Sequence, residues 1–113
     1  MTGDLNVAHQ PIDVFKSENK AKSAGHTKEE RESFTKFLED FSDTFRELHP
    51  GQTKYSYFNL KSGARQKNQG WRLDYVLASK TAKQAVVRSD IDDRIYGSDH
   101  LPIFCELDLT KLG

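Results

Sequence analysis

The sequence predicts an α+β fold, with one mainly antiparallel sheet that carries a helix on one face. Two observations predict this class: one run of apolar residues recurs at the spacing of a helix, and several other runs alternate apolar and polar residues as strands do. The chain has 113 residues, enough for one core, and no change of composition divides it. We therefore expect residues 1–113 to fold as a single unit.

The one clear helix is predicted to begin after Thr27. Thr27 and Glu30 form a capping box, in which the hydroxyl and the carboxylate satisfy free amide groups at the start of a helix. The apolar stripe that follows consists of Phe34, Phe37, Leu38 and Phe41. Such a stripe must face a sheet or another helix. Residues 13–23 before it are polar and have no clear period, which indicates a loop.

Strands are predicted at residues 55–58, 71–78, 85–87 and 102–109. The second of these alternates most cleanly. Its two faces consist of Trp71, Leu73, Tyr75 and Leu77 on one side and Arg72, Asp74, Val76 and Ala78 on the other. The chain opens on Met1–Val7, which resembles the exit of a strand, so we expect the chain to start inside a longer protein.

The composition is that of a folded globular domain. Seventeen Lys and Arg residues balance seventeen Asp and Glu residues, so the net charge of +0 gives no general basic field for nucleic acid. Cys105 is the single cysteine and is predicted to be structural. The sequence shows no signal peptide and no long apolar run. We therefore expect no membrane contact and an intracellular location, the nucleus in a eukaryote or the cytoplasm in a bacterium.

Three short strings place acid, amide or imidazole groups at the ends of predicted strands. They are Gly3–Asn6, Gly70–Tyr75 and Gly97–Ile103. In the first string, Asp4 and Asn6 are two residues apart, so in an extended chain a carboxylate and an amide project to the same side. An Asx-type turn at the strand end is the alternative explanation of this pair.

Asp74 lies within an otherwise apolar strand, where an unpaired carboxylate is costly. Its partner is either Arg72, in a simple ion pair, or a histidine whose ring it orients, and the sequence does not decide between them. His100 is the candidate histidine, because it follows Asp99 directly before a strand and its pKa lies near the pH at which enzymes operate. The remaining histidines, interpreted as structural, are His9, His26 and His49.

Together the strings hold three carboxylates, an amide and an imidazole, which are the groups that phosphodiester hydrolysis requires. Their order, Gly-Asp-Leu-Asn, Gly-Trp-Arg-Leu-Asp-Tyr and Gly-Ser-Asp-His-Leu-Pro-Ile, resembles the exonuclease III/abasic endonuclease family of the endonuclease/exonuclease/phosphatase superfamily. The resemblance implies a four-layer α/β sandwich built from two similar halves, of which this chain looks like the C-terminal half alone.

The resemblance also implies a role for each polar residue. Asp4 would activate the attacking water, and Asn6 would hold that water or the phosphate. His100 would contact the scissile phosphate while Asp74 orients its ring, and Asp99 would lie at or near a site for Mg²⁺ or Mn²⁺. The implied reaction is incision of DNA 5′ to an abasic site, with 3′ exonuclease or 3′ phosphodiesterase activity as further activities of the family.

Trp71 and the pair Tyr57 and Phe58 resemble the family's pocket for a flipped abasic sugar. Many members have Phe then Trp where this sequence has Tyr57 then Phe58, and for Tyr57 an ordinary core aromatic is the alternative interpretation. The predicted loop 61–70 would also face DNA. Its candidate contacts to phosphates are Lys61, Ser62, Arg65 and Lys67. A solvated basic loop is the alternative.

The family's metal-binding Glu, an Asn-Asp pair and a catalytic Tyr have no counterpart in this sequence. Mg²⁺ keeps its waters unless several oxygens surround it, so we expect the chain alone to bind the metal weakly and to be inactive or nearly so. The implied partners are DNA with abasic sites and either the missing N-terminal half or a second copy in a homodimer. The alternatives are another phosphoesterase of the superfamily, acting on a lipid, an inositol phosphate or RNA, and a non-catalytic half-domain that associates with a partner.

Overall fold

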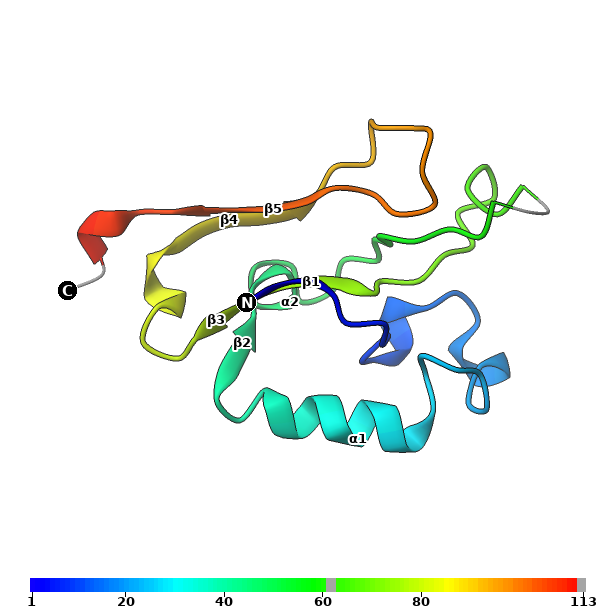
Figure 1. The fold of residues 1–113 in the computed structure, drawn as a ribbon, viewed down its shortest axis with the longest axis horizontal. Coiled ribbons are helices and arrows are strands. Elements are labelled where there is room, and N and C mark those ends of the chain that lie inside the picture. The colour runs from blue at the N-terminus through cyan, green and yellow to red at the C-terminus, as the bar shows by residue number, and fades with distance from the viewer. Residues whose placement is uncertain (61–62, 112–113) are drawn as a thin grey trace.

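The computed structural model of the chain describes residues 1–60 and 63–111. Its larger sheet has three antiparallel strands, in the spatial order β1 (Thr2–Asp4), β3 (Asp74–Ser79) and β2 (Phe41–Asp43). Figure 1 shows that β1 and β3 lie side by side at the centre of the molecule. The α+β class is confirmed, but the strands are divided between two sheets where the sequence predicted one.

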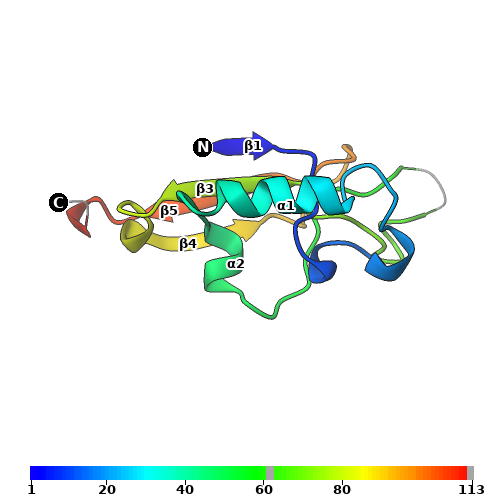
Figure 2. The same ribbon diagram turned by 90° about the horizontal axis from the view of Figure 1, so that it is seen from below.

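The second sheet pairs β4 (Val86–Ile91) with β5 (Ile103–Leu107). Strand β4 is therefore longer than predicted and β5 is shorter. Helix α1 (Lys28–Phe37) runs along one edge of the molecule, and the short helix α2 (Thr44–Leu48) lies on the side of the sheets opposite β1 (Figure 2). Within the described residues, no helix has the length and apolar character needed to cross a membrane.

The register of β1 against β3 determines which side chains meet. Asp4 lies opposite Asp74, and the Leu5 amide continues the pairing by donating to the Leu73 carbonyl oxygen at 3.0 Å. Residues directly opposite each other in an antiparallel pair project to the same face of the sheet. Two carboxylates that are seventy residues apart in the chain are therefore neighbours.

The central strand β3 supplies the core beneath α1. Tyr75 and Leu77 are almost fully buried and pack with Phe34 of the helix, as the alternation of this strand predicted. The predicted capping box of α1 is also confirmed. The Thr27 hydroxyl accepts a hydrogen bond from the Glu30 amide at 3.3 Å, and the Glu30 carboxylate accepts one from the Thr27 amide at 3.2 Å.

The predicted apolar stripe is longer than the helix. Helix α1 ends at Phe37, and Phe41 begins β2, where it lies opposite Ser79 of β3. The prediction that Phe41 belongs to the helical stripe is wrong, because pairing with β3 takes up its backbone. Its ring still stacks on that of Phe37, with 5.4 Å between the centroids. The helical spacing therefore reflects a shared apolar surface that continues beyond the helix.

Residues 55–58, predicted as a strand, form no regular strand. Tyr57 makes a single bridge to Trp71, and the amides of Ser56 and Tyr57 both donate to the same Trp71 carbonyl oxygen at 2.9 Å. The Ser56 hydroxyl accepts a hydrogen bond from the Asp74 amide at 3.1 Å. A side chain thus takes the place of a strand partner here, and β3 consequently begins at Asp74 and not at Trp71.

Arg72 is buried before the start of β3, in contact with Asp13 and Asp43. Its Nε donates to Asp13 Oδ1 at 2.8 Å, and its Nη1 donates to Asp43 Oδ1 at 3.0 Å. Burial alone would lower the pKa of Arg72, but the hydrogen bond and charge of Asp43, together with the charge of Asp13, raise it. Arg72 therefore stays charged within this buried cluster. The interpretation of Arg72 as the ion-pair partner of Asp74 is wrong.

We expect Arg72→Ala to lower the free energy of unfolding by about 3–5 kcal/mol, because it leaves buried Asp43 without its cation and Asp13 with Arg46 alone. Urea unfolding followed by circular dichroism measures the change, as a shift of the midpoint at constant m-value. Arg88→Ala is the control, because Arg88 pairs with Glu106 at 3.3 Å on the surface, where a pair contributes about 0–1 kcal/mol. Equal midpoints for the two variants would contradict the prediction.

Candidate functional site

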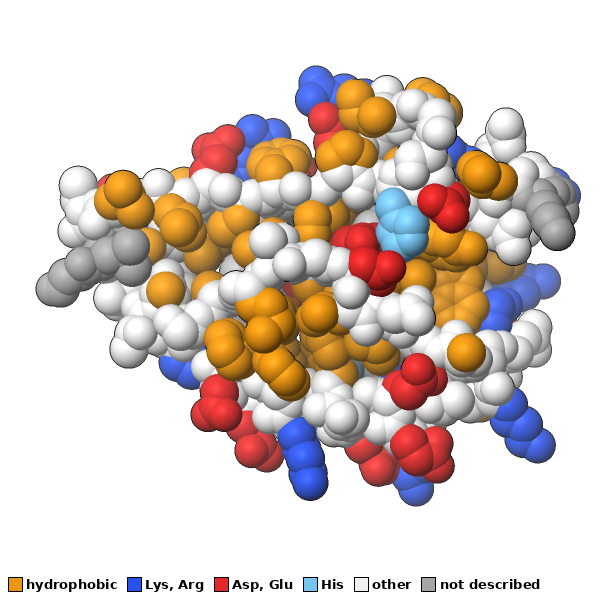
Figure 3. Space-filling view, viewed as in Figure 1, with side chains coloured by type: hydrophobic (Ala, Val, Ile, Leu, Met, Phe, Trp, Pro, Cys, Tyr) orange, Lys and Arg blue, Asp and Glu red, His pale blue; other side chains and the backbone are white. Residues whose placement is uncertain are grey.

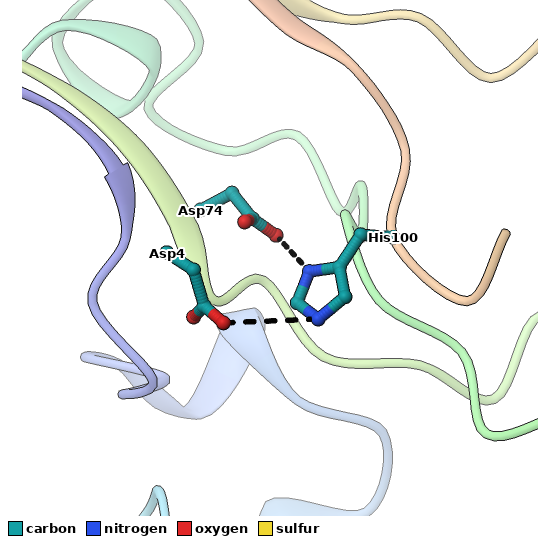
Figure 4. Close-up of side chains that lie close together, drawn as sticks. All are labelled: Asp4, Asp74 and His100. Carbon is teal, nitrogen blue, oxygen red and sulfur yellow. Dashed lines mark hydrogen bonds and ion pairs between the residues drawn. The ribbon is translucent and has the colours of Figure 1, made fainter.

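Two strand ends and one loop bring Asp4, Asp74 and His100 together (Figure 4). Strand β1 ends at Asp4, β3 begins at Asp74, and His100 lies in the loop that leads to β5. His100 Nδ1 is hydrogen bonded to Asp74 Oδ2 at 2.9 Å, and His100 Nε2 lies 3.7 Å from Asp4 Oδ2. Each nitrogen of one imidazole therefore faces a different carboxylate. Of the two partners considered for Asp74, the structure shows the histidine.

The loop before β5 holds His100 by its backbone and by its ring. Gly97 has a φ of +109°, a conformation that favours glycine, and it opens the turn that carries His100. Directly after His100, the Leu101 amide donates to the Ser56 carbonyl oxygen at 2.7 Å. The Tyr57 ring packs on the imidazole, with 5.0 Å between the centroids. The position of His100 is thus set by the segment that contains Ser56 and Tyr57.

The turn after β1 holds Asp4. Asn6 has a left-handed backbone, with a φ of 55°, and its amide donates to Asp4 Oδ1 at 2.8 Å. This is the Asx-type turn that the sequence offered as an alternative. The Asn6 side chain makes no hydrogen bond within the described part of the chain. It lines a cavity of about 440 Å³ next to α1, so Asn6 contacts Asp4 through its backbone and not through its amide group.

The carboxylates around His100 change the pKa of the imidazole. Partial burial alone would lower the pKa of His100, but the hydrogen bond and the charge of Asp74, followed by the charges of Asp4 and Asp99, raise it above 6.5. A protonated ring donates from both nitrogens, one to Asp74 and one toward Asp4. The arrangement therefore favours an oriented imidazolium whose Nε2 side is partly open to solvent.

Asp99 lies outside this group. The ligand atoms of Asp4, Asp74 and His100 all lie within 4.8 Å of one another, and among the described residues Asp99 is not part of that set. Its backbone carbonyl accepts a hydrogen bond from the Phe58 amide at 2.8 Å. The charge of Asp99 reaches His100, but its carboxylate is not placed with the other two.

The aromatic candidates divide between the site and the core. Tyr57 contacts His100, and Trp71 is paired with Tyr57 through the backbone. Both side chains are half-buried against a small apolar cluster. Phe58 is instead buried in the core with Tyr55, at 6.1 Å between the ring centroids, and so does not take part in the predicted sugar pocket.

The basic candidates lie in the loop that follows. Arg65 stacks on the ring of Tyr96 at 3.7 Å from its centroid, and Lys67 is exposed. No contact joins either residue to His100 among the interactions of the described residues. Lys61 and Ser62 lie outside the described residues.

The side chains interpreted as structural are engaged in the fold. His9, His26 and His49 each make a hydrogen bond of 2.7–2.9 Å to a hydroxyl or a backbone carbonyl. Cys105 is half-buried in β5, and burial raises the pKa of its thiol. A raised thiol pKa disfavours the reactive thiolate.

Ser56 was not identified from the sequence as a site residue. It is fully buried, and its hydroxyl accepts hydrogen bonds from the amides of Leu73 and Asp74, at 3.0 and 3.1 Å. Its carbonyl holds the amide after His100. Ser56 therefore connects Asp74 and His100, the two residues of the hydrogen-bonded pair. The one signal for it in the sequence was a single small polar residue in the aromatic run 55–58.

The site offers ligands of two kinds to a metal ion. The carboxylates of Asp4 and Asp74 fit a divalent cation, because Mg²⁺ and Mn²⁺ prefer oxygen ligands. His100 fits only in its neutral form, since a protonated ring has no lone pair to offer, and the neighbouring charges raise its pKa. Two carboxylates are fewer than the oxygens that Mg²⁺ requires, so water or other groups would have to complete the shell.

We expect the pKa of His100 in the metal-free protein to lie above 6.5 and to fall in Asp74→Asn, which removes the charge that accepts from Nδ1. Asp4→Asn should lower it less, because Asp4 is more exposed and its contact is longer. An NMR titration of the ring protons measures each value. Because the pKa of His100 is raised in the folded state, its protonated ring stabilises the fold. This contribution to the free energy of unfolding is complete at a pH below the unfolded-state pKa and is lost as the pH rises through the folded-state pKa. An unchanged pKa in Asp74→Asn would contradict the assignment.

Two relatives in sequence are named for nuclease activity. The DNA repair nuclease APEX1 of Danio rerio is 48% identical over 105 residues, which cover 91% of this chain and 34% of that protein. The exodeoxyribonuclease of Bacillus subtilis is 42% identical over 105 residues, which cover 91% of this chain and 42% of that protein. The chain thus spans well under half the length of these relatives.

Solved structures show the same relationship. The AP endonuclease of Archaeoglobus fulgidus superimposes with a TM-score of 0.86 at 33% identity, over 95% of this chain and 44% of that one. The 3′-5′ exonuclease of Neisseria meningitidis superimposes with a TM-score of 0.89 at 27% identity, over 95% of this chain and 44% of that one. The model of the Endonuclease/Exonuclease/phosphatase family matches residues 1–100. These similarities confirm the resemblance found in the three strings, and the chain belongs to the endonuclease/exonuclease/phosphatase family.

Proposed function

We propose that this chain is a segment of a DNA-repair phosphodiesterase that incises DNA 5′ to abasic sites. One observation carries the proposal: Asp4 and Asp74 face the two ring nitrogens of His100, at 3.7 and 2.9 Å. Phosphodiester hydrolysis needs a base for water and a fixed positive charge at the phosphate, and this group contains both. The names of the relatives, among them an AP endonuclease and an exodeoxyribonuclease, support DNA as the substrate.

His100 would bind the scissile phosphate through Nε2. The Asp74 carboxylate accepts from Nδ1, which fixes the ring and favours its protonated form, so that Nε2 is presented on the side of Asp4. The ring is already packed on Tyr57 before substrate arrives. Binding therefore requires little reorientation of the imidazole, which is the condition under which a hydrogen-bond donor stabilises developing charge well.

Asp4 would accept the proton of the attacking water. Its Oδ1 is fixed by the Asn6 amide, while its Oδ2 faces His100 and the side chain is about half exposed. The distance of 3.7 Å between Asp4 and His100 is longer than a hydrogen bond, so the two groups are close without being locked together. Asn6 would hold the water or the phosphate if its amide group turned from the neighbouring cavity toward Asp4.

A divalent cation, Mg²⁺ or Mn²⁺, would supply positive charge at the phosphate oxygens when it is bound. Asp99 would contribute at or near this ion only if its carboxylate, which lies outside the group of Asp4, Asp74 and His100, turned toward them. Tyr57 and Trp71 would form one wall of a pocket for the abasic sugar, and Arg65 and Lys67 would contact DNA phosphates from the adjacent loop. For each of these residues, the place in the fold and the family relationship support the role.

Association with the rest of a longer protein would complete this segment. Figure 3 shows hydrophobic side chains gathered between β1 and α1, on a face where a histidine and acidic side chains also lie. The cavity there is lined by Leu5, Val7, Phe34 and Phe37, and Phe37 is 44% exposed. An open apolar surface of this kind favours association, with the missing half or with a second copy of the chain.

The chain alone is expected to show little or no Mg²⁺-dependent cleavage of an abasic duplex, because its two or three carboxylates supply too few oxygens for the ion. A gel assay with a labelled abasic duplex, at a range of Mg²⁺ and Mn²⁺ concentrations, measures the rate. The matched control is His100→Ala. Cleavage by the chain that is faster than the His100→Ala background would overturn this part of the proposal.

A chimera tests the chemistry directly. We expect the chain, placed in the Danio rerio relative instead of the segment that it matches, to give a protein that incises abasic duplex DNA. His100→Ala and Asp4→Asn in that chimera should each lower kcat by about 10²–10⁴-fold, the usual contribution of a positioned acid or base. Lys28→Ala is the control, because Lys28 lies in an exposed ion pair on α1. A folded chimera whose kcat is insensitive to both substitutions would refute the assignment.

The same chimera separates the competing substrates. The family match alone includes phosphoesterases in general, so lipid phosphates, inositol phosphates and RNA are the alternative substrates. Incision of abasic DNA with no turnover of these three substrates supports the DNA assignment. Turnover of one of the three without incision of abasic DNA would assign that substrate instead. If the chimera folds but cleaves none of these substrates, the result supports the alternative that the chain is a non-catalytic half-domain.

A further inference from the structure

Two loops meet beside the candidate site. Arg65, in the loop of residues 63–70, donates from Nη2 to the Asp93 carbonyl oxygen at 2.8 Å. Its guanidinium lies 3.7 Å from the centroid of the Tyr96 ring. Tyr96 belongs to the segment that leads from β4 to His100, and Figure 1 shows this segment (orange) beside the loop after residue 58 (green). Arg65 therefore contacts the same loop that carries the imidazole of His100.

Tyr96 is unusually open for an aromatic residue that already has a partner. Its side chain is 75% exposed although the Arg65 guanidinium lies on its ring, and the neighbouring Ile95 is 49% exposed. Neither belongs to a core cluster of the described residues. A large aromatic ring held by a cation, with most of its surface in water, offers a flat face to a ligand.

The charge of Arg65 is not neutralised by an ion pair within the described part of the chain. Two acidic residues nearby have other cations, since Asp90 pairs with Lys54 at 2.8 Å and Asp92 pairs with Arg94 at 3.0 Å, and Arg65 contacts Asp93 through the backbone carbonyl. Arg65 instead contacts a backbone oxygen and a ring. Its remaining donors are therefore available to an anion such as a phosphate.

A cavity of about 320 Å³ lies between the two loops. Its polar walls include Lys54, Arg65, Asn68 and Tyr96, together with one acidic residue, Asp93. The volume is at the lower end of the range for small-ligand sites. An aromatic face, an amide and the guanidinium of Arg65 are groups that bind a nucleotide, because the base stacks on the ring and the phosphate pairs with the cation.

We propose that Tyr96 and Arg65 bind a nucleotide of the DNA strand that flanks the scissile phosphate, with the base stacked on Tyr96 and its phosphate at Arg65. The inference deepens the proposed function and rests on it, because the strand is the one whose phosphate would lie at His100. It assigns a role in substrate positioning to Tyr96, a residue outside the three strings. The site acts before the chemical step and needs no metal.

Binding of single-stranded DNA to the chain, without metal, tests this site. Fluorescence anisotropy is measured with a labelled strand of about ten nucleotides, within the usual site size of single-strand binders, and with a strand of equal length that lacks bases. Tyr96→Ala should weaken binding of the base-bearing strand about tenfold and abolish the preference over the baseless strand. Tyr96→Phe should keep the preference, because the ring remains. Arg65→Ala should weaken binding of both strands.

Leu109→Ala is the matched control, because Leu109 is 71% exposed beyond the end of β5, at the other end of the molecule. Thermal unfolding by circular dichroism shows whether each variant is folded. Equal affinity of folded Tyr96→Ala and Leu109→Ala for the base-bearing strand would overturn the inference, and so would equal binding of the two strands by the unchanged protein.

The Danio rerio chimera distinguishes failure of this inference from failure of the proposed function. If both hold, Tyr96→Ala raises KM for incision about tenfold and leaves kcat unchanged, since the loss affects binding alone. An active chimera whose KM does not respond to Tyr96→Ala overturns the inference and leaves the proposed function intact. An inactive chimera, with strand binding that still depends on Tyr96, overturns the proposed function and supports nucleotide binding at these loops.

Discussion

The buried guanidinium of Arg72 is the interaction on which the rest of the structure depends. It connects Asp13, at the end of the 3-10 helix Pro11–Asp13, to Asp43, at the junction of β2 and α2. A buried cation held by two carboxylates has few alternative positions, because breaking any one contact exposes charge to the interior. The segment that follows Arg72 therefore starts β3 from a fixed point, and Asp74 is only two residues further along.

From that fixed point the site is assembled by backbone pairing. The register of β1 against β3 puts Asp4 beside Asp74, and the buried hydroxyl of Ser56 holds the Asp74 amide. The Ser56 carbonyl also holds the amide after His100. Three segments that are distant in sequence thus share one backbone network. One direct hydrogen bond to Asp74 is enough to orient the imidazole, because the backbone of Asp74 and the backbone next to His100 are already held in place.

The parts of the fold that the sequence predicted are those with a local signal. The capping box located the helix, and the alternation after Trp71 located the buried face of β3. The partners of Arg72 had no such signal, since Asp13 and Asp43 lie 59 and 29 residues away. Phe41 was misassigned because a helix and the strand after it share one apolar surface. For the site, the three strings identified Asp4, Asp74 and His100, whereas Ser56 acts through its small buried hydroxyl, which no pattern marks.

The electrostatics of the site set a requirement on the proposed phosphodiester chemistry. The charges of Asp4, Asp74 and Asp99 all act on one imidazole, so the group carries more negative than positive charge even when His100 is protonated. A phosphodiester brings a further negative charge, and the net charge of the chain is +0. Under the proposed function, positive charge beyond that of His100 would come from a bound cation and from side chains held close to the strand. Arg65, stacked on Tyr96 and free of any carboxylate in the described ranges, is such a side chain, and its place on the adjoining loop would draw the phosphate backbone toward His100 while the carboxylates repel it.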